Sequence, residues 1–157
     1  MRIEKKKPLE KLSENIYKNI NENRITLSRN LSYGSSAACL ILLLQVIPIG
    51  VDNQALKIST LSAVIGMPLW FLIGTIYDMH ISAGENSHGY FAKVQTQNIL
   101  GLLFTIAGLA LLVSISAAIW YLSKDLAIAF IILSSCCIVA GSIYMSMLAE
   151  YIYPKKD

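Results

Sequence analysis

The stretch NILGLLFTIAGLALLVSISAAIWYL, from Asn98 to Leu122, contains no charged side chain. Three further stretches of similar length share this property, at residues 31–51, 58–77 and 126–149. A helix rises about 1.5 Å per residue, so each stretch is about long enough to cross a hydrocarbon core of about 30 Å. The sequence therefore predicts an all-α fold, a four-helix transmembrane bundle in which each helix satisfies its own backbone polar groups.

The composition agrees with burial in lipid. Of the 157 residues, 55% are hydrophobic and 15% are charged, whereas about a quarter of the residues in soluble domains are charged. All Lys, Arg, Asp and Glu residues lie outside the four stretches, because a charge at the bilayer centre costs about 2.5 to 3.5 kcal/mol or more. We expect one bundle over residues 31–157, with a loop at 78–97 and a separate segment at 1–30.

The distribution of basic residues predicts the orientation in the membrane. Of the 13 Lys and Arg residues, all except Lys57 and Lys124 lie before the first span, in the 78–97 loop or in the C-terminal tail. Positive charge concentrates on the cytoplasmic side of membrane proteins. We therefore expect a multi-pass membrane protein, with both termini in the cytoplasm and two short external turns.

The segment before the first span has the pattern of a cytoplasmic amphipathic helix. Its apolar residues recur at helical spacing from Leu9 through Leu12, Ile16 and Ile20 to Leu27. The cations able to contact lipid or an anionic ligand are Lys5, Lys6, Lys7, Lys11, Lys18, Arg24 and Arg29. Three interpretations stay open: the helix lies on the bilayer, copies from neighbouring subunits form a cytoplasmic bundle, or the helix binds another protein or a ligand.

Small residues recur at helical spacing within the spans. Ser59, Ala63, Gly66, Trp70 and Gly74 fall along one face of the second span. Small faces let transmembrane helices approach closely, which supplies contact where lipid removes the hydrophobic drive for association. The small residues that we expect to pack between helices are Gly66, Gly74, Gly101, Gly108, Cys137 and Gly141.

Polar uncharged side chains within the spans are candidates for a water path or a helix interface. They are Gln45, Thr105, Ser135, Ser142 and Ser146. Such groups can line a narrow pore, and four short spans enclose little space, so a pore needs several subunits around an axis. Alternatively, the hydroxyls bond to their own helix backbone, and Gln45 bonds across one helix pair.

The sequence carries no recognisable chemical motif. Asp78, His80, Glu85 and His88 gather in the predicted loop, but their spacing matches no recurrent metal-ligand pattern. No span contains an ionisable Asp, Glu, Lys, Arg or His, which argues against a proton-coupled pump. A Gly-rich phosphate loop and a paired histidine motif are also missing. We therefore expect no metal, no cofactor and no enzymatic activity.

The amphipathic segment at residues 8–30, the compact four-span body and the lack of a catalytic motif occur together in this chain. In this general plan it resembles the small polytopic membrane effectors of bacterial anti-phage defence. The resemblance implies an oligomeric pore that depolarises the membrane, and a cytoplasmic element that receives a nucleotide, oligonucleotide or protein signal. We expect a channel or membrane-disrupting effector controlled by its N-terminal helix; the alternative is a non-conducting anchor or assembly subunit.

Overall fold

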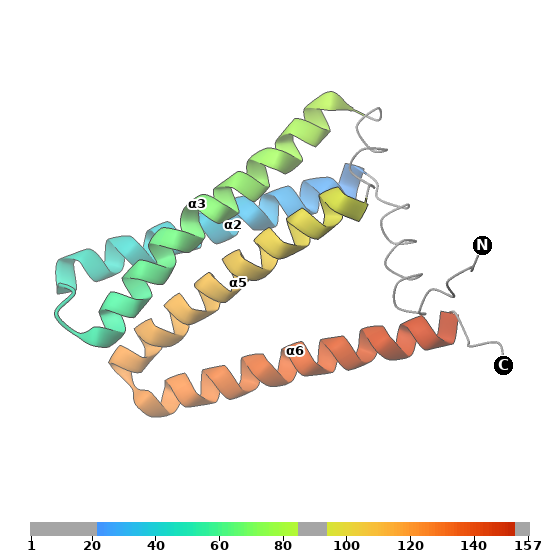
Figure 1. The fold of residues 1–157 in the computed structure, drawn as a ribbon. Coiled ribbons are helices and arrows are strands. Elements are labelled where there is room, and N and C mark those ends of the chain that lie inside the picture. The colour runs from blue at the N-terminus through green and yellow to red at the C-terminus, as the bar shows by residue number, and fades with distance from the viewer. Residues whose placement is uncertain (1–21, 85–93, 153–157) are drawn as a thin grey trace. The chain divides into compact units, whose positions relative to one another are not determined.

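The computed structural model describes residues 22–84 and 94–152, and these parts of the chain are almost entirely helical (Figure 1). The described elements are α2 (Glu22–Val46), the 3-10 helix η1 (Ile47–Ile49), α3 (Gln54–Ala83), α5 (Val94–Leu122) and α6 (Lys124–Ile152). The two described ranges contain no strand. The predicted all-α fold is therefore confirmed for this part of the chain.

Four helical segments are long and apolar enough to cross a membrane. They are Asn23–Ile49, Gln54–Ala83, Asn98–Leu122 and Lys124–Ile152. Each overlaps one of the four charge-free stretches, and α3 extends beyond its stretch at both ends. The helices support the prediction of a multi-pass membrane protein.

The predicted N-terminal helix is described only in part. Residues 1–21 lie outside the described residues, whereas residues 22–30 form the beginning of α2. Because α2 runs without interruption from Glu22 to Val46, the first span and the residues directly before it are one helix. A separate cytoplasmic amphipathic helix stays a prediction.

Proline, glycine and asparagine determine the connection between α2 and α3. Pro48 lies at the start of η1, where its missing N–H prevents α2 from continuing. Gly50 has φ +85°, a conformation that glycine adopts at little cost, and its N–H bonds to the carbonyl of Ile47 at 3.3 Å. Asn53 then caps α3, because its side chain accepts a hydrogen bond from the N–H of Ala55 at 2.8 Å.

A single residue, Ser123, separates α5 from α6. Its N–H bonds to the carbonyl of Ile119 at 2.8 Å, and its carbonyl accepts from the N–H of Ala127 at 3.1 Å. Its hydroxyl accepts a further hydrogen bond from the N–H of Leu126 at 3.4 Å, as an N-cap does. Asp125 in the first turn adds a favourable charge at the helix N-terminus.

α2, α3 and α5 form a three-helix unit in which α3 packs against both of the others (Figure 1). The most buried side chains of α2 and α5 recur every seven residues: Ile25, Ser32, Cys39 and Val46 on α2, and Leu100, Ala107 and Ser114 on α5. The buried residues of α3 recur mainly three and four apart, from Leu56 to His80. A seven-residue repeat is the spacing of left-handed helix packing.

The interior of the three-helix unit is rich in small residues, whereas large apolar residues cover its surface. Ser32, Cys39 and Ser59 are fully buried. Leu61 and Leu102, by contrast, are 63% and 62% exposed. Burying the small side chains and exposing the large ones reverses the arrangement in soluble proteins. It suits a surface that faces lipid and helices that pack closely.

The chain divides into two compact units. One is Asn21–Phe130, which contains the three-helix unit, and the other contains α6 from Ile131 onward. α6 is 29 residues long and apolar enough to cross a membrane. A helix with so much apolar surface needs lipid or protein around it.

Candidate functional site

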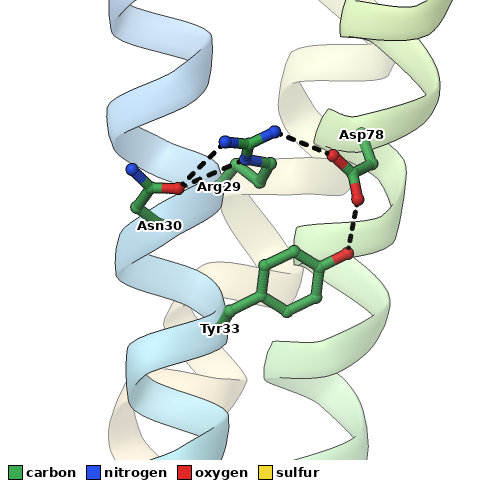
Figure 2. Close-up of polar contacts among 4 residues, drawn as sticks. All are labelled: Arg29, Asn30, Tyr33 and Asp78. Atoms are coloured by element: carbon green, nitrogen blue, oxygen red, sulfur yellow. Dashed lines mark hydrogen bonds and ion pairs between the residues drawn. The ribbon is translucent and has the colours of Figure 1, made fainter.

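Polar side chains of α2 and α3 meet around a single carboxylate, that of Asp78 (Figure 2). Arg29 Nη1 lies 3.1 Å from Asp78 Oδ1, and the Tyr33 hydroxyl donates to Asp78 Oδ2 at 2.9 Å. Arg29 Nε and Nη2 also donate to Asn30 Oδ1, at 3.3 and 3.2 Å. We call Arg29, Asn30, Tyr33 and Asp78 the Asp78 cluster. One carboxylate of α3 thereby holds two successive turns of α2.

The Asp78 cluster is accessible from outside the protein. The side chains of Arg29 and Asp78 retain 30% and 46% of their exposure. A charged pair of this kind is tolerated at the end of a span but not at its centre. Exposed ion pairs contribute about 0 to 1 kcal/mol, so this ion pair is weak enough to break and re-form.

Glycine at position 74 makes room for the tyrosine of the cluster. A Cβ atom on Gly74 would lie 2.7 Å from Tyr33 Cε1, closer than real Cβ contacts occur. The Tyr33 ring also contacts Phe71, with centroids 5.7 Å apart. Phe71, Gly74 and Asp78 lie about one turn apart along α3, so together they form the surface that receives Tyr33.

A second polar contact joins α3 to α5 inside the three-helix unit. Ser59 Oγ donates to the carbonyl of Ser114 at 2.8 Å, and Ser114 Oγ donates to the carbonyl of Ser59 at 2.9 Å. The two hydroxyl oxygens are 3.3 Å apart, and both residues are fully buried. We call this arrangement the serine pair. Each hydroxyl bonds across the interface, whereas serines in helices commonly bond to their own backbone.

A third polar contact lies beside the proline of α3. α3 continues through Pro68, which has no N–H to donate to the carbonyl of Val64. The hydroxyl of Ser36 on α2 donates to the neighbouring carbonyl of Met67 at 3.1 Å. This bond adds a link between α2 and α3 within the predicted span.

The predicted pore-lining side chains are all exposed on the surface of the chain: Gln45, Thr105, Ser135, Ser142 and Ser146. Thr105, Ser142 and Ser146 each donate to the backbone carbonyl four residues earlier, at 2.8, 2.9 and 3.0 Å. Gln45 has no hydrogen-bond partner within residues 22–84 and 94–152. Its amide is therefore available to another molecule.

The predicted packing residues fall into two groups. Gly66 and Gly74 are buried in the contact between helices, and a Cβ on Gly66 would lie 3.3 Å from Cys39 Sγ. Gly101, Gly108 and Gly141 have no atom within 4 Å of an added Cβ, and Cys137 is exposed. The close approach predicted for this second group stays a prediction.

Two of the cations predicted to bind lipid or an anionic ligand lie in the described part of the chain. Arg29 is paired with Asp78, and Arg24 is exposed near the start of α2. The lysines lie outside the described residues: Lys5, Lys6, Lys7, Lys11 and Lys18. The distribution of charges in the sequence did not indicate that Asp78 pairs with Arg29, and the structure adds Asp78 to the candidate functional residues.

No metal centre forms among the described residues, where no group of three or more His, Cys, Asp or Glu side chains comes together. Glu85 and His88 lie outside this part of the chain. Comparisons of the chain with protein-family models, with curated proteins and with solved structures find no match. The polar contacts between the helices are therefore the features of the described residues that bear on function.

Proposed function

We propose that this chain is a subunit of a homo-oligomeric channel, or of a membrane-disrupting effector, in the bacterial inner membrane. The observation that carries the proposal is the exposed amide of Gln45, which has no hydrogen-bond partner among the described residues. An amide left unpaired in an apolar environment costs roughly 2 to 7 kcal/mol. Water in a pore or a neighbouring subunit would remove this cost.

The position of Gln45 along α2 supports its burial in the apolar layer. At about 1.5 Å per residue, Gln45 lies about 21 Å along the helix from Leu31, within a core of about 30 Å. The residues beyond it, Ile47 and Ile49, are apolar and 67% and 57% exposed. Such side chains favour lipid around them, which places the membrane boundary beyond Gln45.

The hydroxyls of α5 and α6 are compatible with a water path. Thr105, Ser142 and Ser146 use their single donor on their own helix. A hydroxyl oxygen retains acceptor capacity after it donates. On α6, Ser142 and Ser146 lie one turn apart, so their oxygens can accept hydrogen bonds from water and stabilise a hydrated cation better than an anion. We therefore propose a narrow, cation-preferring path.

Control from the N-terminal end is the second part of the proposal. α2 is continuous from Glu22 into the span, so rotation or tilt of its first turns is transmitted along the helix. The signal would be a nucleotide, an oligonucleotide or a protein partner, and the basic N-terminal segment would attract anionic lipid or phosphate. A role as a toxic effector in anti-phage defence rests on the shared general plan.

The competing function is a non-conducting anchor or assembly subunit for another membrane protein. It is favoured by the hydrogen bonds that Thr105, Ser142 and Ser146 make to their own backbone, since these hydroxyls need no water. In this case Gln45 and the helix faces that carry Gly101, Gly108 and Gly141 would pack against the other protein.

Ion flux in liposomes distinguishes the two functions. We expect the purified protein to conduct, and Gln45→Leu to reduce flux about fivefold or more, since the loss of the amide costs about 1 kcal/mol or more. Gln54→Leu is the matched control, because Gln54 is an exposed glutamine at the first residue of α3, before the charge-free stretch at residues 58–77. A purified protein that is monomeric and passes no ions, both alone and with the products of neighbouring genes, would favour the function as an anchor or assembly subunit.

A further inference from the structure

The two interfaces of the three-helix unit are held by contacts of different kinds. The α3–α5 interface contains the serine pair, which is fully buried and reciprocal. The α2–α3 interface contains the Asp78 cluster, whose charged side chains are 30% and 46% exposed. Water or ions can replace the bonds of the cluster, but nothing can reach the serine pair without separating α3 from α5.

The Asp78 cluster also concentrates several contacts on one carboxylate. Asp78 Oδ1 faces Arg29 and Asp78 Oδ2 accepts from Tyr33, as Figure 2 shows. The Tyr33 ring is seated over Gly74, where no side chain intervenes. Loss of this carboxylate removes both polar bonds at once, although the ring contact with Phe71 remains. The polar bonds between the N-terminal half of α2 and the C-terminal end of α3 therefore depend on Asp78.

We propose that Asp78 is a releasable latch that holds the N-terminal half of α2 against α3, and that α2 is the helix that moves while α3 and α5 stay fixed by the serine pair. As a control on conduction, this inference rests on the function proposed above; as a statement about helix movement, it does not. The continuous helix from Glu22 to Val46 makes Arg29 and Tyr33 part of the moving element. A signal that competes for the Asp78 carboxylate would release both turns, because both polar bonds end on it.

The distance between spin labels at Asn23 and Ala83 tests the latch directly. Both residues are exposed, near the ends of α2 and α3 that the cluster joins. The labelled cysteines are placed in full-length protein lacking Cys39, Cys136 and Cys137, in nanodiscs. We expect Asp78→Asn to broaden the distance distribution and to extend it by about 5 Å, the rise of one helical turn. Tyr33→Phe, which keeps the ring and loses one bond, should cause a smaller change.

Asp52→Asn is the matched control, since Asp52 is an exposed carboxylate in the turn between η1 and α3. Exchange of the charges, with Arg29→Asp and Asp78→Arg together, should restore a narrower distribution than Asp78→Asn alone. An unchanged distribution in both Asp78→Asn and Tyr33→Phe would overturn the latch. Because Tyr33→Phe alters only one hydroxyl, this result stays informative if Asp78→Asn folds poorly.

Flux in liposomes then separates the latch from the channel. If α2 is the moving element of the channel, Asp78→Asn should raise basal flux about two- to tenfold, as expected for the loss of one or two modest bonds. A longer spin-label distance without flux in any variant would support the latch and refute the channel. Flux that is sensitive to Gln45→Leu, with no change in the spin-label distance, would support the channel and refute the latch.

Discussion

The serine pair gives a sharp test of how α3 and α5 are held together. Ser59→Ala removes the hydroxyl that donates to the carbonyl of Ser114, and Ser114→Ala removes the reciprocal bond. Each substitution leaves the backbone carbonyl that the other hydroxyl needs. The two bonds can therefore be removed separately, and the double substitution measures how far they are coupled, because the two hydroxyl oxygens lie 3.3 Å apart.

The magnitude follows from measured hydrogen bonds between transmembrane helices. Such bonds contribute about 0.6 kcal/mol on average and about 1.7 kcal/mol at most. Both hydroxyls are buried and both bonds are short, at 2.8 and 2.9 Å. We expect each single substitution to lower the free energy of unfolding by about 0.6 to 1.7 kcal/mol, and the double substitution by about 1 to 3 kcal/mol.

Unfolding of the protein in bicelles or mixed micelles, followed by circular dichroism or steric trapping, measures this free energy. Ser116→Ala is the matched control, because that hydroxyl bonds to the carbonyl of Leu112 in its own helix at 2.7 Å. We expect the control to change stability by less than about 0.5 kcal/mol. The reasoning is refuted if Ser59→Ala and Ser114→Ala are both as neutral as Ser116→Ala.

Two further predictions concern stability. Gly74→Ala should destabilise the protein by about 1 to 3 kcal/mol, because the new Cβ would lie 2.7 Å from the Tyr33 ring. Gly101→Ala is the control, because its new Cβ has no neighbouring side chain or helix within 4 Å and should not lower the stability. Equal free energies of unfolding for the two variants would contradict the packing of Tyr33 on Gly74. Asn53→Ala should cost about 0.5 to 2 kcal/mol through loss of the α3 cap, compared with less than about 0.5 kcal/mol for Gln54→Ala. Equal melting temperatures for these two variants would show that the Asn53 cap does not stabilise α3.

The sequence predicts the helices well because lipid imposes a simple rule. A charge-free stretch of the right length forms a helix, and short turns with proline, glycine or asparagine separate the stretches. The same rule ends the second span at the first charge, yet α3 continues through Asp78 to Ala83. Its continuation is explained by the partners of Asp78, since Arg29 and Tyr33 satisfy the carboxylate at the end of the helix.

The buried face of each helix is harder to predict. For α3, the sequence places Ser59, Gly66 and Gly74 on one face, because small residues mark close contact, and all three are buried. For α5, the buried face carries Leu100, Ala107 and Ser114, whereas Gly101 has open space beside it. A membrane helix is apolar on all sides, so hydrophobic periodicity does not distinguish the packed side from the lipid side.

The sequence does not predict which side chains form hydrogen bonds with each other across a helix interface. Ser59 and Ser114 are 55 residues apart in the sequence, and each hydroxyl could equally donate to a carbonyl of its own helix. The pairing of Arg29 with Asp78 likewise depends on the register of α2 against α3. That register is fixed by Tyr33 over Gly74 and by Cys39 beside Gly66, which are details of shape rather than of pattern.

We propose that four helices cross the bilayer with both termini on the cytoplasmic side, and labelling of single cysteines tests this proposal most directly. In a variant without native cysteines, Asp52→Cys, Lys124→Cys and Ser82→Cys place one thiol each in the α2–α3 connection, at the start of α6 and near the end of α3. A membrane-impermeant maleimide added to intact spheroplasts should label the first two positions and reach Ser82→Cys only after permeabilisation. Labelling of Ser82→Cys in intact spheroplasts together with either of the others would contradict the account.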